Sequence, residues 1–115
     1  MADIPVQELG ANGAIANLTF TVGSVSDSFV NTGVELVIMR ALATFAVADN
    51  PTIEGVPAQD SGRDGSEVAT MAAALDEQIG GPYKPRNFVV GGSTTITGGT
   101  DPTKVEIAVI RPTRG

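Results

Sequence analysis

The sequence predicts a single all-β domain, a sandwich or small barrel of about six or seven short strands. Apolar and polar residues alternate in three segments, 16–22, 44–48 and 104–110, and this alternation is the period of a strand with one buried face. Fourteen Gly and seven Pro residues interrupt the chain at short intervals, as turns between short strands require. The 115 residues are a usual length for one domain with one hydrophobic core.

Taken in order, the expected strands begin with residues 16–22, where every second residue is apolar. Residues 34–40 are apolar at nearly every position, which is typical of a strand covered on both faces. Further strands are expected at residues 44–48, 88–90, 94–97 and 104–110, and the last of these alternates most clearly. The predicted core consists of inward residues from three of the strands: Leu18, Phe20, Leu36, Ile38, Val105, Ile107 and Val109.

Residues 67–79 support two interpretations. Five apolar residues recur there at helical spacing: Val68, Met71, Ala72, Leu75 and Ile79. Asp64 and Glu67 can form a capping box, and the Gly-Gly-Pro run at residues 80–82 would end a helix. The alternative is two short strands joined by a turn, in keeping with the rest of the chain. The residues alone leave both open.

The chain contains neither Cys nor His, so it can form no disulfide, no thiolate metal site and no ordinary Ser-His-Asp triad. The acidic turn at residues 60–65 only faintly resembles a calcium loop, because Gly62 and Met71 occupy two positions where oxygen ligands belong. The neighbouring acids Asp76 and Glu77 would diverge on a strand or on a helix, so they would not share one substrate. We therefore expect no enzymatic activity, no catalytic residue, no cofactor and no metal ion.

The formal net charge of −6 argues against sequence-independent binding of nucleic acid, which requires Lys and Arg to replace counterions on the phosphates. The charge is unevenly distributed, since residues 84–115 carry five cations and only two acids. One interpretation is a basic patch that docks on an acidic partner, and the other is scattered, solvated surface charge. No apolar run approaches the roughly 20 residues of a membrane helix, so no membrane partner is expected.

Residues 1–13 are predicted to form an N-terminal arm outside the domain of residues 14–115. A proline and two glycines discourage regular structure in this segment, whereas Ile4, Val6 and Leu9 are apolar and have no obvious place in the core. Exposed apolar side chains usually mark an interface, so these three are expected to contact a partner. The alternative is that Ile4 and Val6 form an edge strand of the domain's own sheet. The segment is acidic, so we expect no secretory signal and synthesis in the cytoplasm.

The order of several segments resembles that of a family of small tailed-bacteriophage capsid decoration (cement) proteins and related head proteins. That order is an alternating strand, a polar turn ending in Asn-x-Gly, an apolar strand, a Gly-Pro-aromatic step and a closing strand of the type Val-x-Ile-Ala-Val-Ile-Arg. In this chain the corresponding residues are 18–22, 27–33, 34–40, 81–83 and 105–111. The Ala-rich run at residues 69–75 departs from the family's pattern.

The resemblance implies a jelly-roll-like β-sandwich of about six to eight short strands with an N-terminal arm, in which residues 67–79 are strand and turn. It implies a structural protein of the virion that binds the outer surface of the major capsid protein lattice and stabilises the head. Its partners would be the major capsid protein and copies of itself, either as a trimer or as neighbours on the lattice. The capsid-contact candidates are the apolar arm residues and four basic residues: Ile4, Val6, Leu9, Lys84, Arg86, Arg111 and Arg114.

The alternative function is that of a carbohydrate- or cell-surface-binding β-sandwich module of a virion, because such sandwiches are common in this role. These modules usually present aromatic side chains on which sugar rings stack. This chain offers only Tyr83 and four Phe residues for that purpose, which favours the decoration role.

Overall fold

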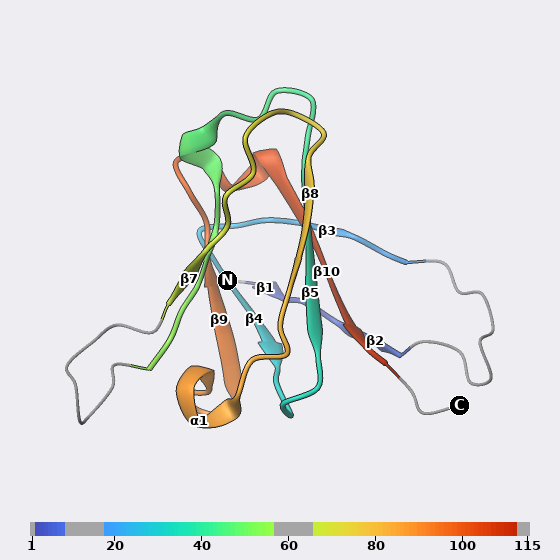
Figure 1. Cartoon of the computed structure of the whole chain (residues 1–115), viewed down its shortest axis with the longest axis vertical. Helices are drawn as coiled ribbons and strands as arrows, with labels where there is room; N and C mark the ends of the chain where they lie inside the picture. Colours follow the sequence, from blue (N-terminus) through green and yellow to red (C-terminus); the bar gives the residue numbers. More distant parts are fainter. Residues whose placement is uncertain (1, 9–17, 57–65, 113–115) are drawn as a thin grey trace.

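The computed structural model describes residues 2–8, 18–56 and 66–112, which form ten short strands in two sheets (Figure 1). Sheet A contains, in spatial order, β1 (Ala2–Asp3), β4 (Ser26–Val30), β9 (Ser93–Thr97), β6 (Thr52–Ile53) and β7 (Glu67–Val68). Sheet B contains β2 (Val6–Glu8), β10 (Val105–Arg111), β5 (Leu36–Ala41) and β8 (Glu77–Gly80), and β3 (Thr21–Val22) also pairs with β10. The helical elements of these ranges are short: α1 (Pro85–Phe88), η2 (Val47–Asp49) and η3 (Pro102–Lys104). The prediction of a small all-β sandwich is confirmed.

Two long strands, β5 and β10, form the middle of sheet B, where they run antiparallel over six residue pairs. The described elements pass from sheet A to sheet B after β1, β4, β7 and β9, and two of these crossings run side by side: β4 and β9 pair in sheet A, and their successors β5 and β10 pair in sheet B. In Figure 1, β7 and β9 lie to the left, and β8, β5 and β10 lie to the right. Because of these crossings, neither sheet is formed by one continuous stretch of the chain.

The core lies between the sheets and is almost entirely aliphatic. β10 contributes Val105, Ile107 and Val109, which are buried as predicted. The other buried members of the core cluster are Ile4, Phe29, Val37, Met39, Ala41, Phe45, Ile53, Met71 and Ile96. Burial of one such large side chain contributes roughly 1.5–3 kcal/mol, so this cluster stabilises a chain that has no cysteine with which to form disulfides.

β5 buries the opposite face from the one predicted. Val37 and Met39 point into the core, where they stand opposite Val109 and Ile107 of β10. Leu36 and Ile38 point outward and are partly exposed, so their assignment to the core is wrong. The reason is that a run of apolar residues has no period of two, and only the pairing with β10 decides which face is buried.

Two further residues of the predicted core, Leu18 and Phe20, also lie outside it. Leu18 is exposed, and the Phe20 ring lies beneath the guanidinium of Arg40, whose carbon is 4.0 Å from the ring centroid. Of the predicted strand 16–22, only β3 pairs among the described residues. Val22 is exposed as well, so none of the described alternating apolar residues of this segment lies in the core.

Residues 67–79 form strand, turn and strand, as the resemblance implied. β7 runs antiparallel to β6, and β8 runs antiparallel to β5. In the turn between them, the Asp76 carboxylate accepts hydrogen bonds from the backbone N–H groups of Ala72 (2.9 Å) and Ala73 (3.1 Å). Leu75 has a left-handed φ of 69°, which no α-helix contains. The helical interpretation of the apolar spacing is wrong.

Residues 2–8 belong to the sandwich. β1 pairs in parallel with β4, β2 pairs in parallel with β10, and Ile4 between them is 3% exposed. The prediction of an arm outside the domain is wrong for these residues, and the edge-strand alternative describes them. A single segment that passes from one sheet to the other places its middle residue in the core, which apolar content alone cannot reveal. The remainder of the predicted arm, and its boundary at residue 14, lie outside the described residues.

Two short predicted strands are replaced by turns. Residues 44–48 lead into η2, with Phe45 buried and Val47 exposed. Residues 88–90 end α1 and contribute a single bridge from Val90 to Ser93. Neither segment belongs to a named strand of the two sheets. The strand predicted at residues 94–97 is confirmed as part of β9.

Candidate binding surfaces

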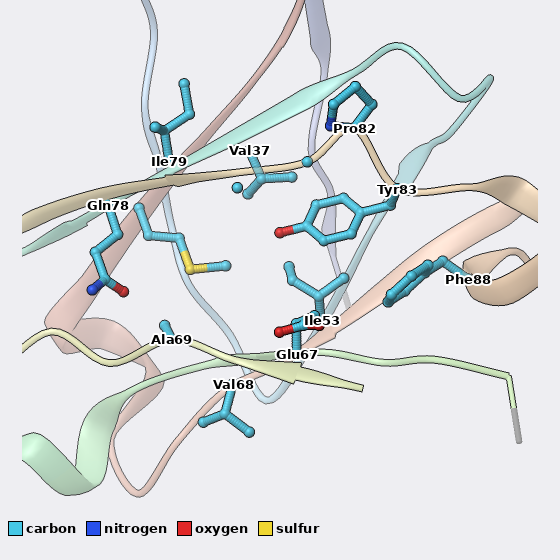
Figure 2. A pocket seen from close by; sticks show the side chains of 13 residues that line it. Val37, Ile53, Glu67, Val68, Ala69, Gln78, Ile79, Pro82, Tyr83 and Phe88 are labelled. Carbon is cyan, nitrogen blue, oxygen red and sulfur yellow. The ribbon is translucent and has the colours of Figure 1, made fainter. Parts of the chain in front are cut away.

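A cleft of about 380 Å³ opens between the two sheets where their edge strands β7 and β8 face each other (Figure 2). Its apolar floor is formed by three core residues, Val37, Met39 and Ile53. Its wall on the side of sheet B is residues 78–83, and Phe88 of α1 closes one end. The cleft exists because β7 and β8 belong to different sheets and cannot pair with each other.

The aromatic wall of the cleft depends on two glycines. A Cβ atom at Gly80 would lie 2.1 Å from the Tyr83 hydroxyl, so only glycine lets this ring fold back over β8. Gly81 has a φ of 101°, a left-handed conformation that favours glycine, and the Gly81–Pro82 peptide bond is cis. The Tyr83 ring then meets Phe88 edge to face, with 4.9 Å between the ring centroids.

Three polar side chains of the described residues line the cleft: Glu67, Gln78 and Tyr83. The amide of Gln78 is engaged, because it accepts from the Thr70 N–H (2.8 Å) and donates to the Thr70 hydroxyl (2.9 Å). Burial raises the pKa of Tyr83 above its ordinary value, and the negative charge of Glu67 raises it further. The cleft therefore combines an apolar floor, two aromatic rings and one carboxylate.

A second hollow, of about 500 Å³, lies at the other side of the sandwich, where residues 3–6 pass from sheet A to sheet B. It is lined by Phe29 of β4 and by Arg111 at the end of β10. The Arg111 side chain is held there by two carboxylates, with Nε 2.6 Å from Glu35 and an amino nitrogen 3.5 Å from Glu8. The guanidinium thus closes an internal ion-pair network.

Glu35 was not identified from the sequence, although it is the one charged residue within the apolar run of residues 34–39. Its side chain is 0% exposed. Burial alone would raise its pKa, but hydrogen bonds from the hydroxyl and backbone N–H of Thr32 and from Arg111 outweigh burial and lower the pKa to about 2. A charged residue that interrupts an apolar strand is the signal that could have found it.

The outer faces of the two sheets differ in character. On sheet A, all outward residues of three paired strands except the exposed Val30 carry hydroxyl groups: Ser26, Ser28, Thr52, Ser93, Thr95 and Thr97. On sheet B, register places Ile38 between Ile79 and Ala108, with Leu36 beside Ile110. These five residues define the apolar outer face of sheet B, on which Ile79 is 61% exposed, Leu36 and Ile38 are partly exposed, and Ala108 and Ile110 are buried. An aliphatic outer face is unusual for a sandwich, whose strands normally alternate apolar-in and polar-out.

Two of the charged residues beside this apolar face, Arg40 and Glu106, compensate each other. Arg40 pairs with Glu106 across β5 and β10, and its guanidinium also covers the Phe20 ring at 4.0 Å. Because these charges are paired within the domain, a partner can cover the face without leaving them unneutralised. The face is therefore suited to contact with another protein.

The predicted contact residues do not form one patch. Ile4 is a core residue, so its apolar character is explained by the fold, and Arg111 is held by two carboxylates. Lys84 and Arg86 are exposed beside and within α1, and neither forms an ion pair with any described residue. Val6 is partly buried opposite Val109. The remaining candidates, Leu9 and Arg114, and the acidic turn at residues 60–65 lie outside the described residues.

Within the described ranges no group of three or more Asp or Glu side chains is arranged to hold a metal ion, and no helix is long and apolar enough to cross a membrane. Comparison with protein-family models, with curated proteins and with solved structures finds no match to this chain. Its function must therefore be argued from its surfaces.

Proposed function

We propose that this protein is a capsid decoration protein, which binds the outer surface of the major capsid protein lattice of a tailed bacteriophage and stabilises the head. The apolar outer face of sheet B is the surface that docks. The segment order that resembles the decoration-protein family supports the class of protein, and the contrast between the two outer faces supports the choice of surface.

The observation that carries the proposal is the continuous row of aliphatic residues on the outer face of sheet B, where Ile79 is 61% exposed. Ile79, Ile38 and Leu36 point to solvent from adjacent strands, whereas the outer face of sheet A is rich in Ser and Thr. Covering an apolar surface contributes roughly 25 cal/mol per Å² before the costs of association, so a face of this kind is stabilised by contact with a partner. Many equivalent lattice sites then multiply a modest affinity when neighbouring copies touch.

The alternative of a carbohydrate-binding module has less support from the aromatic residues, all five of which are described. Phe29 and Phe45 are buried, and Phe20 lies beneath Arg40. Tyr83 and Phe88 meet at an interplanar angle of 60° at the cleft, so they form no common flat platform for a sugar ring. A docking surface for protein is the better interpretation.

The test is co-sedimentation of the protein with phage heads from which it has been removed. Ile79→Asp should abolish binding, because it places an unpaired charge at the most exposed aliphatic position of the contact. Val68→Asp is the matched control: Val68 is 58% exposed on the outward side of the edge strand of sheet A, as Ile79 is on the edge strand of sheet B. Both variants should fold as the unmodified protein does, since both positions are exposed.

Equal binding by the two variants would show that another surface docks. If the unmodified protein failed to bind such heads, the decoration proposal itself would be wrong. A capsid or head-protease gene beside the gene for this chain would be independent support.

A further inference from the structure

In the edge strand β7 the charged side chain points inward and the apolar side chain points outward, the reverse of the usual arrangement. Its register with β6 sets Glu67 opposite Ile53, an inward core residue, and Val68 opposite Thr52, an outward one. The carboxylate therefore points into the space between the sheets, and the valine points to solvent. Figure 2 shows this arrangement, with Glu67 directed toward the Tyr83 side and Val68 directed away from the cleft.

The surroundings of the Glu67 carboxylate complement a cation on an apolar stem. Val37, Met39 and Ile53 form a floor that can cover methylene groups. Tyr83 and Phe88 provide aromatic faces and a hydroxyl oxygen at the wall. Within the described part of the chain no Lys or Arg pairs with Glu67.

We propose that this cleft binds a basic side chain, lysine or arginine, of a protein partner. The stem lies on the aliphatic floor, and the cationic group meets the Glu67 carboxylate beside the ring of Tyr83. Carboxylate and aromatic ring attract the same cation, the first through its full charge and the second through the negative face of its π-system. A chain with a net charge of −6 also favours basic partners at longer range.

The raised pKa of Tyr83 supports this geometry, because Glu67 is one of its two causes. The competing explanation is that an inward charge on an edge strand only prevents pairing with another chain. The two explanations differ in what they predict for binding. A charge that only protects the edge would bind no ligand, whereas a recognition site would bind a basic side chain. This inference does not depend on the capsid proposal: Ile79 borders both the cleft and the apolar outer face of sheet B, but its side chain points outward, whereas Glu67 points into the cleft.

The experiment titrates the isolated protein with Nα-acetyl-lysine N-methylamide and, separately, with Nα-acetyl-norleucine N-methylamide, which has the same stem without the ammonium group. Binding is followed by backbone amide shifts in two-dimensional NMR spectra, which detect dissociation constants on the order of a millimolar. The lysine probe should shift amides of residues 78–83 and 67–69, and the norleucine probe should leave them unchanged. Added salt should weaken the lysine titration, because the carboxylate is exposed to solvent.

Two variants make the assignment specific. Glu67→Gln should weaken the lysine probe about tenfold, the effect of losing one charge-assisted contact. Glu77→Gln is the matched control, because it removes the same charge from the outward face of the edge strand β8, on the other side of the cleft. Both glutamates are exposed, so both variants should keep the melting temperature of the unmodified protein.

Three results would overturn the inference. Equal binding of lysine and norleucine probes would make the cleft a simple apolar groove. Equal weakening by Glu67→Gln and Glu77→Gln would reduce the effect to net charge. No shift of the cleft amides with either probe would leave Glu67 as a protective inward charge. None of these results bears on docking through Ile79, which the head-binding experiment decides.

Discussion

At the scale of single residues, Glu35 shows how a buried carboxylate can be tolerated. Its oxygens accept hydrogen bonds from the Thr32 N–H and hydroxyl at 2.7 Å each and from Arg111 Nε at 2.6 Å. Every one of these donors favours the ionised form, which offsets the cost of burial. The carboxylate thereby joins the turn before β5 to the end of β10, far apart in sequence.

This network makes the stability of the protein depend on pH in the acid range. The Glu35 pKa falls from 4.5 in the unfolded chain to about 2 in the fold, so the folded state favours the ionised group. Its contribution is fully present above about pH 4.5 and is lost as the pH falls toward 2. At about 1.4 kcal/mol per pKa unit, the shift corresponds to roughly 3 kcal/mol.

Glu35→Gln should therefore lower the free energy of unfolding at pH 7 and flatten its decline between pH 4.5 and pH 2. Urea unfolding at a series of pH values measures both effects. Glu77→Gln serves as the control, because Glu77 is exposed and should leave the acid decline in place. An unchanged pH profile in Glu35→Gln would show that other carboxylates carry the acid sensitivity.

At the scale of strands, the sequence predicts an element well where only one face is apolar. It predicts poorly where pairing with a neighbouring strand determines which face is buried or which secondary structure forms. In β10, the inward residues Val105, Ile107 and Val109 are separated by Glu106 and Ala108, so the buried face could be predicted correctly from the sequence. In β5, apolar residues occupy both faces, so the sequence alone does not show whether Val37 or Ile38 is buried. The pairing of β5 with β10 decides which face is buried. Residues 67–79 had helical spacing, yet pairing with β5 and β6 overrode local preference.

The candidate site was less predictable than the fold, for a related reason. Glu67 was interpreted from the sequence as part of a helix cap, whereas it lies on an edge strand whose register with β6 turns the carboxylate inward. The cleft itself arises between two sheets, from β7 on one side and β8 on the other. The Gly-Pro-Tyr step at residues 81–83 was noted as a motif, but its place at this cleft depends on the close approach of Tyr83 to Gly80.

A single substitution, Ile4→Ala, can test whether residues 2–8 belong to the folded domain. Ile4→Ala should lower the free energy of unfolding by roughly 2–5 kcal/mol, because it removes a side chain buried between the sheets. Val25→Ala, at an apolar position that is 75% exposed, should cost about 0.5 kcal/mol or less. Urea denaturation gives both values. A small cost at Ile4 equal to that at Val25 would restore the picture of an arm outside the domain.

At the scale of the whole molecule, the two sheets should unfold together. The chain crosses from sheet A to sheet B after β4 and again after β9, so neither sheet is built from one continuous stretch. β10 contacts β2, β3 and β5, and its inward residues meet side chains of sheet A in one core. A domain of this size with one core normally unfolds in a single cooperative step.

Ile107→Ala tests this cooperativity, because Ile107 is 1% exposed at the centre of β10. The change should lower the free energy of unfolding by roughly 2–5 kcal/mol, whereas Ile79→Ala on the outer face of the same sheet should cost far less. The chain has one Tyr and no Trp, so its intrinsic fluorescence reports on Tyr83 alone, at the cleft. Far-ultraviolet circular dichroism and Tyr83 fluorescence should give coincident unfolding curves, and Ile107→Ala should shift both equally. A fluorescence transition that stays in place while the circular dichroism transition moves would show that the cleft unfolds independently of the core.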